Sequence, residues 1–456
     1  MLDSEEKNLS DRLALSKLEI LLLKNCDVQD TCFLGMRELK VLSLTIADGS
    51  SRVISLYALR FLPKLRALHL ENFEDFMFLG NLMTLEILSL RGSKSEGLAN
   101  QLGRLENLKV LDLTDYVLSS SFSSNVIRRL SQLEELHLSS TTNDIFLVIK
   151  SLTRLTRLNL WVSSLHFPPD FEFPELENYN ICINHRSSRL DYHFEEARSL
   201  KVKIVFPYNA VSQLLGNLES LVVSGIKDEY VECLANKTQQ KVSVSMILRN
   251  LKQVTIEHCS NLKVVFQVEE VEENEAPLLS NLKMLHLERL PVLSCIWELP
   301  TQHVRLESLV YLTIRQCPRL KSLFSLSLAQ SLVLLEALTI EYCPELNKLV
   351  TELGDEGEIS LAINSHTSLC FPKLTELYIS TCDDLEYIFP TSLASHGLQG
   401  LTIHGCPKLK QVFGVANDSM LQYQQSLRSL SSFTIFDCPQ LTDSVVHLEA
   451  EKASIQ

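Results

Sequence analysis

A sixteen-residue phrase that recurs through the second half of the chain constrains the fold more than any other feature. Its template is L-x-x-L-x-[IL]-x-x-C-P-x-L-x-x-[ILV]-F, and the stretch LTIRQCPRLKSLF at residues 312–324 is a clear copy. Seven copies align, and their second apolar slot holds Val254, Leu285, Leu312, Leu338, Leu377, Leu401 and Phe433. The next apolar slot holds Ile256, Leu287, Ile314, Ile340, Ile379, Ile403 and Ile435. Because every copy keeps these slots apolar, one unit of structure is repeated along the chain.

A looser form of the phrase, L-x-x-L-x-x-L-x-L, runs through the first half, for example in LPKLRALHL, LMTLEILSL and LTRLTRLNL. The two forms together give about 17 units, most of them separated by roughly 20 to 33 residues. This spacing and pattern are typical of leucine-rich repeats, in which each unit supplies one strand and a return segment. The sequence therefore predicts an α/β solenoid: a leucine-rich-repeat horseshoe with about 17 irregular repeats and a concave parallel β-sheet.

The alternation of apolar and polar residues assigns the two faces of each strand. In YLTIR, Leu312 and Ile314 point one way, whereas Tyr311, Thr313 and Arg315 point the other. The first pair is expected in the solenoid core, and the second set is expected to line the concave face. A surface built this way suits a large partner better than a small ligand.

Breaks in the repeat pattern divide the chain. We expect an N-terminal segment at 1–14, looser repeats at 15–245, repeats of the Cys-Pro type at 246–445 and a C-terminal tail at 446–456. Polar insertions near 267–277 and 351–368 are expected to be loops. They are interpreted as solvated loops, with a docking site for a basic partner as the alternative.

The charge balance excludes several classes of function. The net charge is −14 with a pI near 5.4, which disfavours a nucleic-acid binder and adsorption to anionic membranes. The chain starts with the acidic MLDSEEKNLS rather than a secretory signal, and no apolar run is long enough to span a membrane. Twelve cysteines without an export signal indicate reduced thiols in the cytoplasm or the nucleus, with disulfides the less favoured alternative.

The recurring cysteines are predicted to be packing residues. Cys26, Cys259, Cys317, Cys343, Cys382, Cys406 and Cys438 share one slot, which Leu290 and Phe73 fill in other copies. A metal site cannot accept leucine or phenylalanine as a ligand, so no metal is expected there. The prolines that follow, such as Pro318, suit a turn leaving the strand. Phe266, Trp297, Phe324, Phe389 and Phe413, with Val350 and Val445 in other copies, are predicted to form a ladder that closes the core on the convex side.

No catalytic or cofactor-binding pattern occurs in the sequence. His69, His137 and His286 share one concave position but belong to separated repeats, too far apart to bind one ion together. The carboxylates Glu257, Glu288 and Glu341 occupy the concave edge without an apolar pocket that would raise a pKa. Nucleotide-binding loops, nucleophile elbows and zinc-protease motifs are missing, so neither an enzyme nor a bound cofactor is expected.

A series of phrases between about residues 15 and 445 carries a family resemblance. They include MRELKVLSL, LENLKVLDLTD, LSQLEELHLSS, FPELENYNICI, LKMLHLERLPVLSCIW and FPKLTELYISTCDDLEYIF. The chain resembles the leucine-rich-repeat domain of plant intracellular nucleotide-binding, leucine-rich-repeat disease-resistance proteins of the coiled-coil class. That family also has a nucleotide-binding module, whose phosphate-binding loop does not occur in this sequence, so nucleotide binding is not expected of this chain.

The resemblance implies a protein-protein recognition module in plant innate immunity. Such repeats sense pathogen effectors or effector-modified host proteins, and they restrain a nucleotide-binding module in cis or in trans. One alternative is a leucine-rich-repeat substrate adaptor of a ubiquitin ligase, which CPQLTDSVVHL somewhat resembles. Another is an extracellular receptor ectodomain, which would need a signal peptide and paired flanking cysteines.

The bulky or charged residues of the concave face are the candidates for partner binding, because interfaces favour Trp, Tyr and Arg at their energetic centres. They are Arg91, Arg157, Trp161, Tyr311, Arg315, Tyr342, Tyr378, His404 and Phe436. The competing interpretation of each is an ordinary exposed strand residue.

Overall fold

The structure is a computed structural model that describes most of the repeats. Its described residues are 15–26, 30–46, 56–94, 97–116, 124–140, 144–163, 166–184, 198–203, 207–226, 244–267, 276–299, 303–351, 371–389, 397–413 and 430–441. The predicted segment 1–14, the tail 446–456 and nearly all of the two predicted loops lie outside these residues, as do Val445 and the side chains of Phe389 and Phe413.

Two compact units make up the chain. Unit 1 comprises residues 1–200 and 209–214, and unit 2 comprises residues 201–208 and 215–456. Seventeen described strands belong to the main parallel sheet, and β9 (Arg198–Lys203) lies where the units divide. The number of strands agrees with the number of repeats expected from the sequence.

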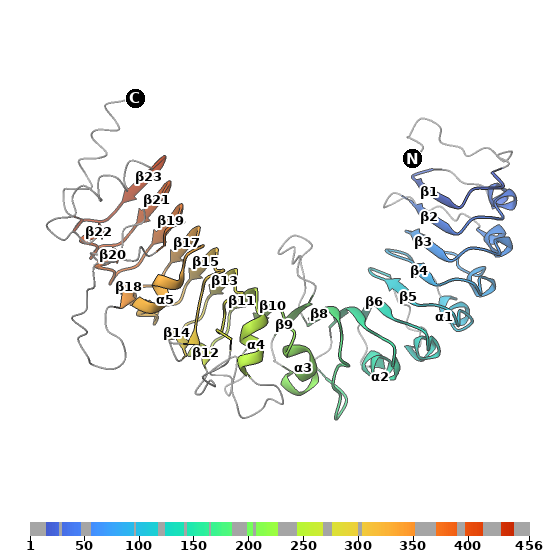
Figure 1. Ribbon diagram of the computed structural model, residues 1–456, viewed down its shortest axis with the longest axis horizontal. Helices are drawn as coiled ribbons and strands as arrows, with labels where there is room; N and C mark the ends of the chain where they lie inside the picture. The colour runs from blue at the N-terminus through green and yellow to red at the C-terminus, as the bar shows by residue number, and fades with distance from the viewer. Residues whose placement is uncertain are drawn as a thin grey trace. The chain divides into compact units, whose positions relative to one another are not determined.

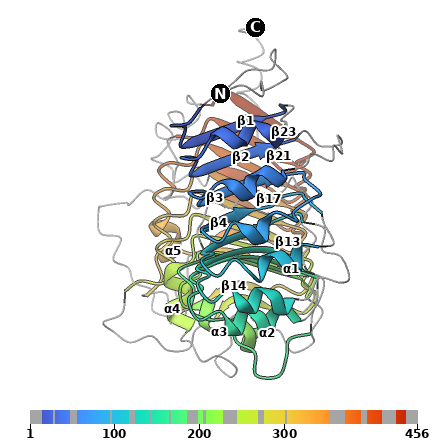
Figure 2. The same ribbon diagram turned by 90° about the vertical axis from the view of Figure 1, so that its right-hand side faces the viewer.

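In unit 1, eight strands pair in parallel, each with the next along the chain. They are β1 (Ile20–Lys24), β2 (Val41–Thr45), β3 (Ala67–Glu71), β4 (Ile87–Ser89), β5 (Val110–Leu113), β6 (Glu135–Ser140), β7 (Arg157–Val162) and β8 (Asn178–Ile183). Figure 2 shows the first of these strands stacked one beside the next.

The return segments of unit 1 contain short helices on the other side of the sheet (Figure 1). The 3₁₀ helices are η1 (Asp30–Gly35), η2 (Tyr57–Phe61), η3 (Leu79–Asn81) and η4 (Ser124–Arg129), and the α-helices are α1 (Leu98–Leu102) and α2 (Asp144–Ser151). Helix α3 (Tyr208–Leu215) follows β9. Buried residues such as Leu59, Leu79 and Leu102 anchor these turns on the core.

In unit 2, eight strands form the parallel face. They are β10 (Ser220–Ser224), β11 (Gln253–Glu257), β13 (Met284–Glu288), β15 (Tyr311–Arg315), β17 (Ala337–Glu341), β19 (Glu376–Ser380), β21 (Gly400–His404) and β23 (Ser432–Phe436). The register is uniform from β11 onward, so equivalent residues of successive repeats lie side by side.

The return segments of unit 2 contain short strands, which the sequence pattern did not predict. The strands β12 (Val264–Gln267) and β14 (Cys295–Glu298) form one small sheet, and β16 (Ser322–Ser325), β18 (Lys348–Thr351), β20 (Tyr387–Phe389) and β22 (Gln411–Phe413) form another. The helices of this unit are α4 (Val244–Asn250) and α5 (Leu326–Ser331).

The core of each repeat lies where alternation predicts it. Leu312 and Ile314 are buried, whereas Tyr311 is exposed and Thr313 and Arg315 are partly exposed. The same holds for both apolar slots of every strand from β11 to β21, and in β23 the equivalent Phe433 and Ile435 are half-buried. Burial of these apolar side chains, at about 25 cal/mol per Å² removed from water, is the main force holding successive repeats together. The predicted α/β leucine-rich-repeat solenoid with a concave parallel sheet is therefore confirmed.

The aromatic ladder of the return segments is also present where its side chains are described. The ring of Trp297 stacks between Phe266 at 5.4 Å and Phe324 at 6.4 Å between centroids. The indole Nε1 of Trp297 donates a hydrogen bond of 2.8 Å to the carbonyl of Leu323. Strand pairing places Phe266 opposite Trp297 and Phe324 opposite Val350, so each ring contacts the next repeat.

Candidate functional site: the strand face and edge groove

The outward residues of unit 2 form three parallel rows, here called the strand face. The first row is Gln253, Met284, Tyr311, Ala337, Glu376, Gly400 and Ser432, and the second is Thr255, His286, Thr313, Thr339, Tyr378, Thr402 and Thr434. The third row is Glu257, Glu288, Arg315, Glu341, Ser380, His404 and Phe436. The rows are straight because every strand pair keeps the same register.

Aromatic side chains stand out from these rows. Tyr311 is 50% exposed, Tyr378 is 38% exposed and Phe436 is 65% exposed, although each has a large apolar ring. Their outward position follows from the alternation, because their strand neighbours Leu312, Leu377 and Ile435 point inward. Exposed aromatic rings on a regular surface are well suited to contact another macromolecule.

The third row pairs its charges and rings with the adjacent strand. Arg315 Nε lies 3.1 Å from Glu341 Oε1 on β17. His404 stacks on Phe436 with ring centroids 5.2 Å apart and planes 9° apart. The structure therefore brings His404 and Phe436 together, and it holds Arg315 in an ion pair rather than free for a partner.

A groove lies beside the third row, at the edge where the strands end. It has a volume of about 690 Å³ and is lined by two rows of residues. The first wall is His258, Arg289, Gln316, Tyr342 and Thr381, and the second wall is Ser260, Pro291, Pro318, Pro344 and Asp383, each two residues further along the chain. We call it the edge groove. Arg289 donates to Gln316 Oε1 at 2.7 Å and lies 2.6 Å from His258 Nε2, which links three repeats along one wall.

The first wall of the edge groove has an unusual backbone. His258, Arg289, Gln316, Tyr342 and Thr381 all have a φ between 54° and 57°, in the left-handed region. Each follows the last residue of a strand, where the chain turns away from the sheet. Tyr342, which is 52% exposed, is the only one of these five residues that the sequence singled out. Residue types such as His, Arg or Gln do not indicate a positive φ, so the sequence did not predict the groove.

Of the three candidates in unit 1, Arg91 and Arg157 are held in ion pairs. Arg91 follows β4, and its Nε lies 3.3 Å from Asp112 Oδ2. Arg157 begins β7 and pairs with Glu135 at 3.3 Å, and Trp161 is half-buried on the same strand. Burial raises the pKa of Asp112, but hydrogen bonds from Thr114 and the charge of Arg91 outweigh it, so that this pKa lies below its ordinary value.

The recurring cysteines are structural, as predicted. Cys259, Cys317, Cys343, Cys382 and Cys406 are buried and free of disulfides, whereas Cys26 and Cys438 are partly exposed. Each thiol donates to the carbonyl two residues before it, for example Cys317 to Arg315 at 3.4 Å. Burial raises the pKa of Cys259 to about 11 and the pKa values of Cys317 and Cys343 to about 12. These thiols are therefore protonated and unreactive at neutral pH. The prolines after them lie in turns, also as predicted.

The structure contains one cluster of possible metal ligands that the sequence pattern did not predict. Glu257, His286 and Glu288 place one ligand atom each within 4.8 Å of one another. The neighbours of His286 in space are carboxylates on its own strand and on the strand before, rather than the other concave histidines. The available signal was His-x-Glu in one repeat and Glu at the matching position of the preceding repeat.

Comparison with known proteins gives one family. Residues 203–344 match the family described as plant disease resistance protein RPS2-like, leucine-rich repeats. Disease resistance protein At4g27190 of Arabidopsis thaliana is 26% identical over 299 residues, which cover 59% of this chain and 29% of that protein. At4g19050 of the same plant, whose name places it in the same class, is 26% identical over 186 residues, covering 40% of this chain and 14% of that protein. The chain thus spans less than a third of the length of either relative.

Two solved structures are similar over much of the chain. The Leptospira interrogans leucine-rich-repeat protein LIC12759 is 18% identical with a TM-score of 0.41, over 94% of this chain and 96% of that one. An internalin, InlF, from Listeria monocytogenes is 15% identical with a TM-score of 0.41, over 75% of this chain and 85% of that one.

Among the described residues, none of the helices combines the length and the apolar character that crossing a bilayer requires. The repeats present a broad surface of parallel strands, an arrangement suited to contacts with proteins. The match over 203–344 and the two plant relatives show that the repeats of this chain are similar to the leucine-rich repeats of plant disease-resistance proteins.

Proposed function

We propose that this domain recognises a protein partner in plant innate immunity through the strand face and the edge groove of unit 2. The partner is a pathogen effector, a host protein modified by an effector, or a nucleotide-binding module that the repeats restrain. Recognition takes place in the cytoplasm or the nucleus, and the domain performs no catalysis and needs no cofactor. Support comes from the relatives, which are named as disease resistance proteins.

The observation that carries the proposal is the coincidence of exposed rings and a hollow on one side of unit 2. Tyr311, Tyr378 and Phe436 are exposed on the strand face, and Tyr342 lines the edge groove next to it. Threonines lie among the rings, since Thr313, Thr339 and Thr402 share the second row with Tyr378. A surface of short polar residues with isolated aromatic anchors allows tight packing of a partner around the rings.

The first test compares two variants of the whole chain expressed in plant tissue. In the face variant, Tyr311, Tyr378 and Phe436 are replaced by alanine. In the matched control, Leu326 and Val333, which are 36% and 42% exposed on the return-segment side of unit 2, are replaced by alanine. Proteins retained by each variant and by the wild type are compared by quantitative mass spectrometry, and thermal unfolding confirms that all three proteins are folded.

The expected result is a protein that is retained by the wild type and by the control variant but lost with the face variant. An identical set of retained proteins for all three would contradict the proposal. The identity of the lost protein discriminates further: an effector, a host target or a nucleotide-binding protein fits the proposed role. A scaffold subunit of a ubiquitin ligase would instead favour the substrate-adaptor function.

A further inference from the structure

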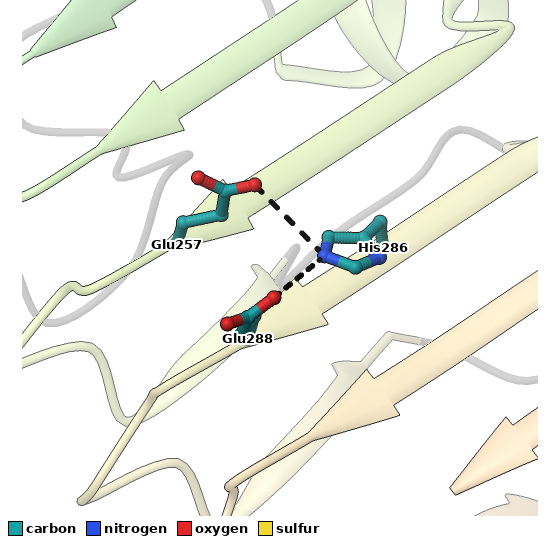
Figure 3. Close-up of side chains that lie close together, drawn as sticks. All are labelled: Glu257, His286 and Glu288. Carbon is teal, nitrogen blue, oxygen red and sulfur yellow. Dashed lines mark ion pairs between the residues drawn. The ribbon is translucent and has the colours of Figure 1, made fainter. Parts of the chain in front are cut away.

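Three side chains meet on the strand face where β11 and β13 pair. His286 and Glu288 are two residues apart on β13 and so share one face, and Glu257 is the register partner of Glu288 on β11. Figure 3 shows both carboxylates turned toward the imidazole. His286 Nε2 lies 3.4 Å from Glu288 Oε2 and 3.9 Å from Glu257 Oε1.

The imidazole nitrogen at the centre of this cluster lacks a hydrogen bond. Nε2 of His286 is shielded from solvent and has no hydrogen-bond partner among the described residues, and the side chain as a whole is only 13% exposed. The carboxylate oxygens are close, but both distances exceed the usual length of a hydrogen bond between nitrogen and oxygen, about 2.7 to 3.2 Å.

A second polar atom, on the neighbouring strand, is also unsatisfied. Thr255 is the register neighbour of His286, it has no exposed surface, and its Oγ1 has no hydrogen-bond partner within the described part of the chain. Buried polar groups in folded proteins are nearly always paired, so these two unsatisfied atoms on adjacent strands call for partners, either a water or an ion.

We propose that Glu257, His286 and Glu288 bind a divalent transition-metal ion, with zinc as the representative. Two ligand atoms about 2.1 Å from a tetrahedral zinc ion lie about 3.4 Å apart, which matches the separation of the imidazole nitrogen from Glu288. Imidazole and carboxylate are ordinary zinc donors, and three protein ligands leave a fourth position open. Two carboxylates also neutralise the double charge of the ion.

The neighbouring cation fits this arrangement. Arg289 Nε lies 3.6 Å from Glu288 Oε1, which leaves Oε2, the oxygen nearest the imidazole, directed into the cluster. Such outer contacts orient the ligands of metal sites. The ion would cross-link two adjacent repeats, because its ligands come from both β11 and β13.

Two other histidines of the chain lack features of this cluster: one has a satisfied ring nitrogen, and the other has no third ligand. His137 Nε2 makes a hydrogen bond of 2.7 Å to Glu135, so its nitrogen is satisfied. His69 and Glu71 on β3 repeat the sequence Leu-His-Leu-Glu of β13, but the strand before them places Thr45 where β11 places Glu257. The β3 pair therefore has two of the three ligands and serves as an internal control.

The test is isothermal titration of the purified, metal-stripped whole chain with zinc sulfate. The proposal predicts one ion bound per chain at this site, with affinity reduced at least about tenfold by each of Glu257→Gln, His286→Gln and Glu288→Gln. The double variant His69→Gln/Glu71→Gln should bind zinc as tightly as the wild type. Circular dichroism checks that every variant retains its fold.

Cysteines could also capture zinc, so cobalt distinguishes the two kinds of site. Cobalt bound to nitrogen and oxygen donors gives visible bands without the strong near-ultraviolet band of a thiolate ligand. Loss of the cobalt spectrum in His286→Gln would support the proposal. Undiminished binding in that variant, a thiolate band that persists in it, or no zinc binding by the wild type would overturn it.

Discussion

The two units form the same turn at the end of their strands, but they use different residues in it. Where the chain leaves each strand of unit 1 with a positive φ, the residue is Asn25, Asn72, Gly92, Asp115 or Asn184. At the matching place in unit 2 the residues are Gly225, His258, Arg289, Gln316, Tyr342, Thr381, Gly405 and Asp437. Glycine and asparagine adopt this conformation at little cost, whereas bulky or β-branched residues do not.

The difference shows where unit 2 keeps residues that are unfavourable for the backbone conformation of the turn. Left-handed conformation costs an ordinary residue about 1 to 2 kcal/mol, and one residue in each of five successive repeats of unit 2 has this conformation. Those five are one wall of the edge groove. Strain that persists in a cluster is a pointer to function, and it agrees with the proposal that this side of unit 2 binds a partner.

The return segments differ in a related way. Unit 1 uses short helical turns, and unit 2 uses strands that pair between repeats and stack aromatic rings. The reason is local sequence: LKSLF in unit 2 puts a β-forming run with adjacent apolar residues after the turn, whereas FLGNL in unit 1 places leucines at helical spacing around a glycine.

The largest expected contrast is in thiol reactivity. Burial raises the pKa of Cys317 from 9.0 to about 12, so at neutral pH its thiolate fraction should be about a thousandfold below that of an ordinary thiol. Alkylation followed by mass spectrometry should label Cys26 of unit 1 in the native protein and spare Cys317 and Cys343 until the protein unfolds. Rapid labelling of Cys317 in the native protein would contradict the prediction, because it would show that this thiol is accessible to the reagent.

The same raised pKa values predict that stability falls with pH in the alkaline range. Unfolded thiols ionise near pH 9, but the buried ones stay protonated up to about pH 12. Their contribution to stability is complete below pH 9 and is lost as the pH rises toward 12.

The next contrast concerns the aromatic ladder in the return segments of unit 2. Trp297→Ala removes two ring contacts and a hydrogen bond to Leu323, and it should lower the free energy of unfolding by about 3 kcal/mol. Hydrogen exchange should accelerate in β12, β14 and β16. Leu79→Ala in η3 is the matched change in unit 1 and should accelerate exchange there instead; a loss of protection that does not follow the mutated unit would contradict this account.

A smaller effect is expected from exchanging residues at the turn. Thr381→Asn should raise the free energy of unfolding by about 1 kcal/mol, because asparagine tolerates the left-handed conformation. Asn72→Thr should lower it by at least that much, since it adds strain and removes the hydrogen bond of Asn72 to Ile46. Chemical denaturation measures both, and a destabilised Thr381→Asn would show that threonine is not strained there.

The smallest effect belongs to the ion pair of Arg91 and Asp112. Arg91→Ala should cost less than about 1 kcal/mol at neutral pH, because the arginine is 51% exposed. The pKa of Asp112 is lowered in the folded protein, so its contribution is present above pH 3.8 and disappears as the pH falls through the lower folded value. Denaturation of both proteins across this range tests the sign.

The repeat pattern predicted most of the fold, because the leucine positions and the period-two alternation follow directly from the residue types. It assigned Leu312 and Ile314 to the core and Tyr311 to the outer face correctly. It could not predict which outward residues pair with the next strand, as Arg315 does with Glu341, because charge neighbours depend on register between repeats. For the same reason it missed the contact of His286 with Glu257.

The central claim is that the strand face and the edge groove of unit 2 form the recognition surface. Hydrogen exchange of the chain, alone and with the partner that the face variant loses, tests it most directly. The account predicts slower exchange on binding in β15, β19 and β23 and in the turn at Tyr342, with no change in α5. Protection confined to α5 or to the helical turns of unit 1 would contradict it.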